Sequence, residues 1–397
     1  MARAHQRGRR RPVSRLLAVT LCGIFACDVE VIHPTQFVAP PLADPSLPGP
    51  HRVGVTTLST ISEGGRTLPV EVWYPAVPEE GAPVTDYPLT IGTLELAIIP
   101  SGLGAVRDAP LDKTGSPHPT VVFSHGHSGF RTQSVYLMEH LASHGFVVAA
   151  PDHVGGSLIA SNLSPPGEVA RYRPSDVSAT LDLLLSQSED VESPLYFSVD
   201  PGRVGVAGHS YGGFSAFRVA GALIDAEAIA DQCEDELLCD GWDETLPASQ
   251  RDDRFIAALM QSPAAVFTYE PLEANLAPIE IPVIIMGGSH DDITPYAEEC
   301  APPFGALTST SMIVLVEGAG HFTFSNVCSL LDELGLEIEF LGNGCGDDDI
   351  APKDAQRIAA SYATAFFQET LIGETPSDLL DEGMALGDHV LAFERKP

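Results

Sequence analysis

Ser210 is the residue whose surroundings most clearly permit chemistry. It stands at the centre of a Gly-His-Ser-Tyr-Gly pattern at residues 208–212. The apolar run 203–207 before the pattern predicts a buried strand, and residues 214–223 after it predict a helix. In a strand–turn–helix of this kind the glycines allow a sharp, strained turn, which lifts the serine hydroxyl clear of the sheet edge. Ser210 is therefore the predicted nucleophile.

A serine nucleophile needs a general base, and that base needs a carboxylate to orient it. Asp291 and Asp292 occupy a turn after the predicted strand 283–286. Asp291 stands three residues after a glycine and four before a proline, which favours it as the acid; Asp292 is the alternative, and turns commonly contain such aspartates. His321 follows the next predicted strand on a glycine-rich loop, so the order Ser, Asp, His fits a nucleophile of this type.

The reaction also needs two backbone N–H groups to stabilise an oxyanion. One is expected from Tyr211, directly after the nucleophile. The other is expected from His127, in the loop that follows the predicted strand 120–124. His125 and His127 could instead bind a metal, but no acid or cysteine is spaced to complete such a site. The predicted chemistry therefore needs no metal and no cofactor.

Short apolar segments alternate with helical patterns along the chain. Strands are predicted at 53–59, 68–74, 120–124, 146–150, 203–207, 264–267, 283–286 and 312–316, the last being the final strand; helices are predicted at 133–143, 175–186, 214–223 and 355–368. Ser175 or Asp176 would cap the second helix. This alternation indicates an α/β fold, with a mainly parallel sheet covered by helices on both faces. Asp152 and His153 follow one of the strands and are expected to line the pocket or to hydrogen-bond the loops.

Residues 222–261 interrupt this alternation with an acidic, partly helical insertion. Because the insertion follows the predicted nucleophile helix directly, it can lie over the strand ends as a lid or pocket wall. We expect it to influence substrate choice; a solvated surface excursion is the alternative.

The N-terminus has the features of an export signal. Six arginines and no acid occupy residues 1–15, and residues 16–26 form an apolar run too short to span a bilayer. Residues 1–26 are thus a predicted signal peptide. Small residues before Cys27 resemble a bacterial lipobox, which predicts a lipid-tethered protein of the periplasm or cell envelope; a free extracellular product is the alternative. Residues 27–50 are proline-rich and predict a tether, and residues 51–397 a single domain.

The chain is strongly acidic, with a formal net charge of −33, and loss of the six N-terminal arginines would leave −39. This charge argues against nucleic acid as a partner and is typical of solubility outside the cell. No protein partner is indicated.

Five cysteines follow Cys27. In an oxidising compartment they favour disulfides over metal sites. Cys233 with Cys239 would form a local loop, and Cys328 with Cys345 would close a 17-residue interval and contribute about 3 kcal/mol. Cys300 would remain free, although a Cys300–Cys328 bridge competes.

Four segments together are typical of one known family: Ser124-His125-Gly126 with Phe130-Arg131, Pro151-Asp152-His153, the Gly-His-Ser-Tyr-Gly-Gly segment 208–213 and Gly320-His321-Phe322. By these motifs, residues 53–367 resemble the platelet-activating-factor acetylhydrolase and dienelactone-hydrolase-like group of α/β-hydrolases. Bacterial polyester-cleaving cutinases share the fold. The resemblance implies hydrolysis of short or truncated acyl esters without a metal. It departs at the two adjacent aspartates and in the insertion, which has no counterpart. A dienelactone hydrolase proper would use a cysteine nucleophile, so Ser210 argues against that activity.

Two further interpretations remain. A polyester or cutin depolymerase would need an open, aromatic-lined groove, for which Trp73 and Trp242 are the only tryptophans. A non-catalytic surface binding protein would be expected to lack one residue of the predicted triad, and none is missing.

Overall fold

The computed structural model describes residues 43–91, 94–157, 164–232, 242, 245–336, 342–373, 377–381 and 389–397. The predicted signal peptide, Cys27, most of the predicted tether and the pair Cys233 and Cys239 lie outside these ranges. Within them, no helix combines the length and apolar character needed to cross a bilayer.

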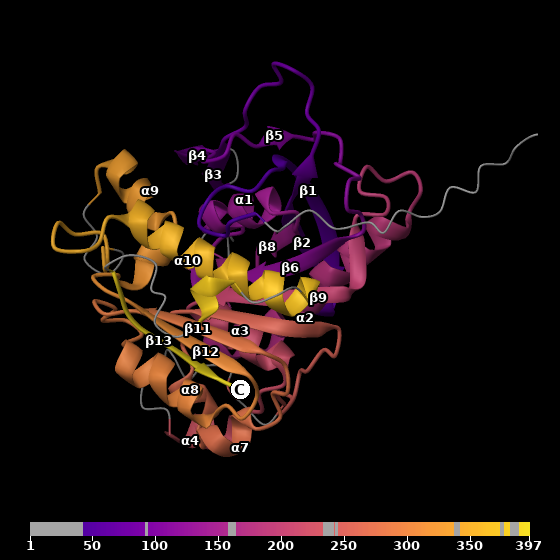
Figure 1. The fold of residues 1–397 in the computed structure, drawn as a ribbon. Helices are drawn as coiled ribbons and strands as arrows, with labels where there is room; N and C mark the ends of the chain where they lie inside the picture. The colour runs from indigo at the N-terminus through magenta and orange to yellow at the C-terminus, as the bar shows by residue number, and fades with distance from the viewer. Residues whose placement is uncertain are drawn as a thin grey trace, which may run out of the picture. The chain divides into compact units, whose positions relative to one another are not determined.

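A ten-stranded sheet forms the centre of the described unit (Figure 1). From edge to edge its strands are β13 (Val390–Lys396), β12 (Ser311–Val316), β11 (Val283–Gly288), β10 (Phe255–Gln261), β9 (Val199–His209), β6 (His118–Ser124), β8 (Val147–Pro151), β2 (Arg66–Ala76), β1 (Arg52–Ser62) and β5 (Val106–Arg107). The six strands from β12 to β8 are mutually parallel, whereas β13 and β2 run antiparallel to their neighbours in that set. This arrangement confirms the predicted α/β class.

Helices cover both faces of the sheet. The α-helices among the described residues are α1 (Val135–Ser143), α2 (Pro166–Glu189), α3 (Tyr211–Ala220), α4 (Ala226–Gln232), α6 (Val266–Tyr269), α7 (Leu272–Leu276), α8 (Ala301–Ala306), α9 (Val327–Leu334) and α10 (Pro352–Phe367). One apolar core lies between the sheet and α1 and α10, and a second lies between the sheet and α2, α3, α7 and α8. A separate hairpin pairs β3 (Tyr87–Ile91) with β4 (Leu94–Ile99), and β7 (Ser128–Gly129) is a two-residue strand.

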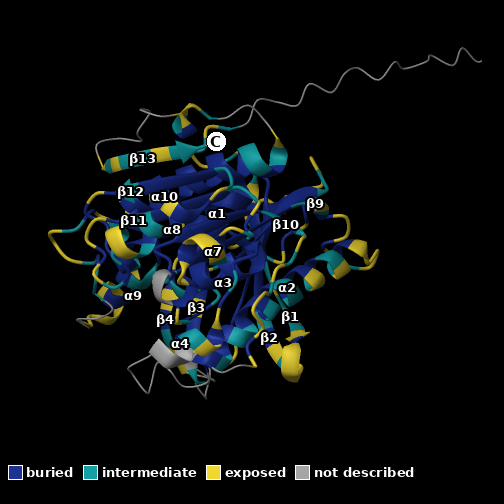
Figure 2. Ribbon diagram, turned by 90° about the horizontal axis from the view of Figure 1, so that it is seen from below, coloured by how far each residue is buried: buried dark blue, intermediate teal, exposed yellow. Residues whose placement is uncertain are grey.

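Burial on both faces explains why the sequences of the central parallel strands are continuous apolar runs. Every residue of β6, β8 and β11 is buried, because helices cover both of their faces. The edge strand β13 has no fully buried residue, and Figure 2 shows it in the colours of intermediate and exposed residues. It follows the predicted closing helix, so the prediction that residues 312–316 form the last strand was wrong.

Two other predictions failed next to prolines. The predicted strand 264–267 is wrong: the strand here is β10, which ends before Pro263, and α6 begins at Val266. Helix α2 begins at Pro166 instead of near Ser175, and Pro174 lies inside it. Since proline usually interrupts helices, the sequence favoured a start after Pro174. Neither Ser175 nor Asp176 therefore caps the helix.

Two predicted boundaries also move. The insertion cannot extend to residue 261, because Phe255–Gln261 is a central strand of the sheet. At the other end, the last residues of the predicted tether already belong to the compact unit. The Pro45 and Leu47 carbonyls accept hydrogen bonds from the His140 and His144 rings, at 3.0 and 2.8 Å.

One predicted disulfide is present. Cys328 is bonded to Cys345, and Cys300 is buried and free. The competing bridge between Cys300 and Cys328 is therefore wrong.

Candidate functional site

Ser210 occupies the sharp turn between β9 and α3. Its backbone has φ 56° and ψ −121°, a strained combination for a residue other than glycine. Two glycines make the turn possible. A Cβ at Gly208 would lie 2.0 Å from the Gly212 carbonyl oxygen, and a Cβ at Gly212 would lie 1.8 Å from that of Ser124. Both positions must lack a side chain so that the helix can pack against the strand ends.

Asp291 and His321 meet at the ends of β11 and β12. His321 Nδ1 lies 3.2 and 3.0 Å from the two carboxylate oxygens of Asp291. The backbone N–H groups of Ile293 and Thr294 donate to Asp291 Oδ1 at 3.0 and 2.8 Å, and the Thr294 hydroxyl donates to Oδ2 at 3.0 Å. These bonds hold the carboxylate beside the imidazole, where it can orient the ring.

The electrostatics favour an ionised Asp291. Burial raises the pKa of its carboxyl, but the hydrogen bond and charge of His321 and the Thr294 amide outweigh burial, and the net pKa is lowered. Asp292 is exposed, and its carboxylate lies 3.5 Å from the Asn343 side-chain amide. Of the two aspartates, the structure brings only Asp291 to His321.

The His321 loop adjoins the nucleophile turn through His209. His209 Nε2 lies 2.9 Å from the His321 carbonyl oxygen, and the two rings are 4.8 Å apart. Because a carbonyl can only accept, Nε2 carries the proton. Within the described residues the Ser210 hydroxyl makes no hydrogen bond to His321. Contacts of this kind often tighten only when substrate binds.

Gln133 connects the same histidine to the predicted oxyanion loop. Its side-chain NH₂ donates to His209 Nδ1 at 2.9 Å, and its Oε1 accepts from the Gly126 amide at 3.1 Å. The oxyanion loop, the nucleophile turn and the His321 loop are thereby joined in one chain of hydrogen bonds. Sequence reasoning missed Gln133, which it placed only at the start of a helix. His209 was in the motif, but its spacing carried no signal for this contact.

The residues that carry the two predicted oxyanion donors lie close together. The His127 ring is 6.0 Å from the ring of Tyr211, and an added Cβ at Gly126 would lie 3.4 Å from Ser210 Cβ. Because Gln133 already accepts from the Gly126 amide, that N–H is occupied. The His127 amide has no hydrogen-bond partner among the described residues. The His127 amide thus remains available to a substrate oxygen.

The other polar residues near this loop are engaged in hydrogen bonds. Asp152 is buried and accepts from the Arg131 amide at 2.7 Å and from its guanidinium, which agrees with the predicted hydrogen bonding to the loops. His125 donates through Nδ1 to the Gly126 carbonyl at 2.8 Å and accepts through Nε2 from the His153 amide at 3.1 Å. Both ring nitrogens of His125 are therefore used. Across the described ranges, no three His, Cys, Asp or Glu side chains converge to hold a metal ion.

Buried neutral histidines predict acid sensitivity. Burial, with the charge of neighbouring histidines, lowers the pKa of His209 to about 3 and that of His144 to about 4. Below pH 6.5 the unfolded chain binds protons at these histidines while the folded chain does not, so stability falls as the pH falls. The loss is about 1.4 kcal/mol per pH unit for each such group until its folded pKa is reached.

Urea unfolding between pH 7 and pH 4 checks this expectation. His144→Gln keeps a donor for the Leu47 carbonyl but removes one titrating histidine. The free energy of unfolding of this variant should therefore fall less steeply as the pH is lowered, by about 1.4 kcal/mol per pH unit. An unchanged slope in this variant would contradict the assignment.

Comparison with known proteins agrees with this geometry. A model described as alpha/beta hydrolase family matches residues 121–327. Cutinase 2 of Thermobifida cellulosilytica is 27% identical over 212 residues, which cover 53% of this chain and 63% of the cutinase. Platelet-activating factor acetylhydrolase of Canis lupus familiaris is 32% identical over 145 residues, 27% of this chain and 32% of that protein. The chain thus spans less than two thirds of these relatives.

A solved structure of ferulic acid esterase from Streptomyces cinnamoneus superposes with a TM-score of 0.59 at 25% identity. The match covers 84% of this chain and 94% of the esterase.

Proposed function

Since this chain belongs to the alpha/beta hydrolase family, we propose that it hydrolyses carboxylic esters with Ser210 as nucleophile, His321 as general base and Asp291 as the orienting acid. The observation that carries the proposal is the contact of His321 Nδ1 with the buried Asp291 carboxylate. His321 lies on a loop whose backbone is hydrogen-bonded to His209, the residue before Ser210. That pairing leaves Nε2 of His321 as the nitrogen that can take a proton from serine.

The reaction then follows from these positions. The Ser210 hydroxyl oxygen attacks the ester carbonyl carbon while its proton passes to His321, and the carbonyl oxygen becomes an oxyanion held by the His127 and Tyr211 amides. Collapse of this intermediate expels the alcohol, which takes the proton from His321. Water, deprotonated by His321, attacks the acyl-enzyme and releases the acid and free Ser210. Asp291 stays ionised throughout.

Small-molecule esters are the proposed substrates, with short acyl groups preferred. The names of the relatives support an ester bond as the target, since they include a cutinase, an acetylhydrolase and a ferulic acid esterase. The acyl preference rests on the resemblance of the sequence to acetylhydrolases.

A fluorophosphonate probe and a series of nitrophenyl esters test the proposal together. We expect covalent labelling of Ser210, located by peptide mass spectrometry, and hydrolysis that is fastest for acetate and butyrate and declines for longer chains. Hydrolysis of every ester at the uncatalysed rate, without labelling, would identify the chain as a binding protein. A maximum at long acyl chains would refute the short-acyl preference alone.

Polyester cleavage is the second candidate, favoured by the cutinase relatives. Both tryptophans are buried, with Trp73 packed in the core and Trp242 against Phe214, so neither supplies an exposed aromatic wall. Release of soluble acids from a polyester film, compared with nitrophenyl ester turnover, distinguishes the two candidates.

Export is proposed on two grounds. The N-terminal residues have the pattern of a signal peptide, and the Cys328–Cys345 disulfide favours an oxidising compartment. Lipidation at Cys27 would tether the protein to a membrane. Mass spectrometry of the mature N-terminus, produced in an exporting bacterial host, distinguishes a lipidated Cys27 from a free cleaved end.

The insertion is proposed to set acyl length. Trp242, one of its described residues, contacts Phe214, which stacks on Tyr211 beside the nucleophile.

A further inference from the structure

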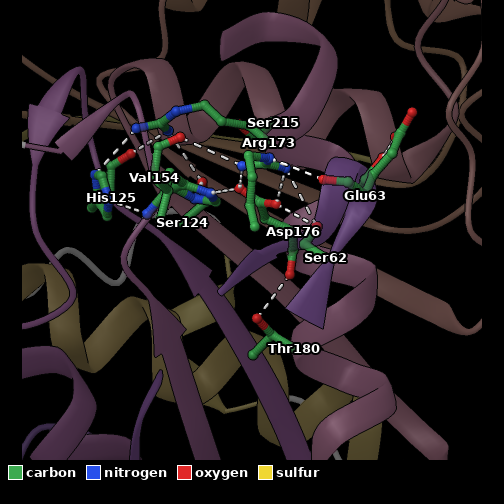
Figure 3. Close-up of polar contacts among 12 residues, drawn as sticks. Ser62, Glu63, Ser124, His125, Val154, Arg173, Asp176, Thr180 and Ser215 are labelled. Carbon is green, nitrogen blue, oxygen red and sulfur yellow. Dashed lines mark hydrogen bonds and ion pairs between the residues drawn. The ribbon is translucent and has the colours of Figure 1, made fainter. Parts of the chain in front are cut away.

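Arg173 is a fully buried cation directly beneath the oxyanion loop. It projects from α2, its side chain has no exposed surface, and Figure 3 shows it together with Ser124 and His125 at the end of β6. Its guanidinium donates to the His125 carbonyl at 2.5 Å and to the Gly126 carbonyl at 2.7 Å. A buried guanidinium costs free energy unless its N–H groups are hydrogen-bonded. Movement of either carbonyl away from Arg173 would therefore be unfavourable, and this holds both carbonyls in place.

The Gly126 carbonyl and the His127 amide belong to one peptide group. Because the peptide is planar and trans, its C=O and N–H point in opposite directions. Whatever fixes the Gly126 oxygen therefore aims the His127 N–H. Besides Arg173, that oxygen accepts from His125 Nδ1 at 2.8 Å and from the Gly129 amide at 3.1 Å.

The protonation of His125 follows from its other contact. The His153 amide donates to His125 Nε2, so Nε2 is an acceptor and Nδ1 carries the proton. All three partners of the Gly126 oxygen are consequently donors. Arg173 is the charged one, and a charged donor polarises a peptide more strongly than a neutral donor does.

The charge of Arg173 is not cancelled by a hydrogen-bonded acid. Among the described residues no carboxylate accepts from its guanidinium. Asp176, one turn along α2, accepts instead from Arg66, His153 and Ser62, the last of which Figure 3 shows beside it. Burial lowers the pKa of Arg173 to about 10, which leaves it charged at neutral pH. The guanidinium carbon lies 5.0 Å from the centre of the Tyr211 ring. The cation thus adjoins the residues of both proposed oxyanion donors.

We propose that Arg173 is a positioning residue for the oxyanion hole: it orients and polarises the Gly126–His127 peptide so that the His127 amide faces the reacting oxygen. The kinetic part of this inference rests on the proposed ester hydrolysis. The structural part, the orientation of the His127 amide, does not.

Arg173→Met and Arg173→Lys test the proposal kinetically. Misdirecting one oxyanion donor should lower kcat by about 10²–10³-fold in Arg173→Met, with KM nearly unchanged. Affinity for a trifluoromethyl ketone, which forms a tetrahedral adduct with serine, should fall by a similar factor. Arg173→Lys keeps the charge but not the two-pronged geometry, so we expect an intermediate loss. It also carries the test if Arg173→Met does not fold.

Arg218 provides the matched control. It is equally buried and donates to the carbonyls of Pro247, Ala248 and Ala222, none of which belongs to the oxyanion loop. Arg218→Lys should lower the melting temperature while leaving kcat and ketone affinity within about threefold of the wild type. Arg173 variants that lose only stability, as this control does, would overturn the proposal.

A measurement independent of turnover separates this inference from the proposed function. In protein labelled with ¹⁵N-histidine, the His127 amide resonance, assigned with His127→Gln, should shift in Arg173→Lys and stay in place in Arg218→Lys. An unmoved resonance in Arg173→Lys would refute the positioning role, even in an active enzyme. A wild type without esterase activity would refute the proposed function and leave the resonance shift as the decisive test.

Discussion

Replacing Ser210 by alanine is expected to lower kcat for ester hydrolysis by about 10⁶-fold, because the three residues of a triad act as a unit and the remaining rate comes from the oxyanion hole and binding alone. The fold should persist, since the substitution removes one hydroxyl without opening a large cavity. Steady-state kinetics on nitrophenyl acetate, with circular dichroism to verify folding, measures both effects.

Ser215→Ala is the matched control for this prediction. Ser215 lies on α3, the helix that follows Ser210, and it is buried and donates to the Tyr211 carbonyl at 3.1 Å; its replacement by alanine removes the same hydroxyl group. We expect nearly full activity. A folded Ser210→Ala protein that kept substantial activity would show that the nucleophile is another residue.

Asp291→Asn is expected to lower kcat by about 10⁴-fold. A neutral amide can present its NH₂ to His321 Nδ1, which stabilises the tautomer that cannot accept the serine proton. The Thr294 and Ile293 amides that hold Asp291 would still find an oxygen, so the loop should keep its shape. The measurement is kcat at neutral pH, with the melting temperature recorded alongside.

Asp292→Asn controls for the loss of one negative charge from the same turn. Because Asp292 is exposed and lies beside Asn343, away from His321, we expect activity within a few fold of the wild type. A large loss in Asp292→Asn with little loss in Asp291→Asn would transfer the role of the acid to the neighbouring residue.

The features that could be predicted from the sequence are those with local causes. The turn at Ser210 depends on glycines two residues to either side, and the close contacts of Gly208 and Gly212 explain why that spacing is informative. The α/β class followed from short apolar strands that are buried on both faces. The Cys328–Cys345 pairing followed from spacing and an expected oxidising compartment.

Predictions failed where a local rule competed with packing. Pro174 favoured a later start for α2, yet the helix continues through it; Asp176, which would have capped the shorter helix, instead lies buried against Arg66 and His153. Strand β10 was assigned to the insertion because a single apolar run of seven residues does not reveal which neighbours it will have in a sheet. In both cases the burial of long-range partners decided the structure.

The sequence by itself determined which residue types stand at the strand ends: a serine on a glycine turn, an aspartate pair, and a histidine on a glycine-rich loop. Only the tertiary structure favours Asp291 over Asp292 as the proposed acid, because adjacent residues of a turn point in different directions and Asp291 is the one that contacts His321. It alone also joined Gln133 to His209 and placed the buried Arg173 against the oxyanion loop. These contacts join residues 47 to 76 positions apart in the sequence. The spacing of residues along a chain does not reveal which distant residues will meet in the fold.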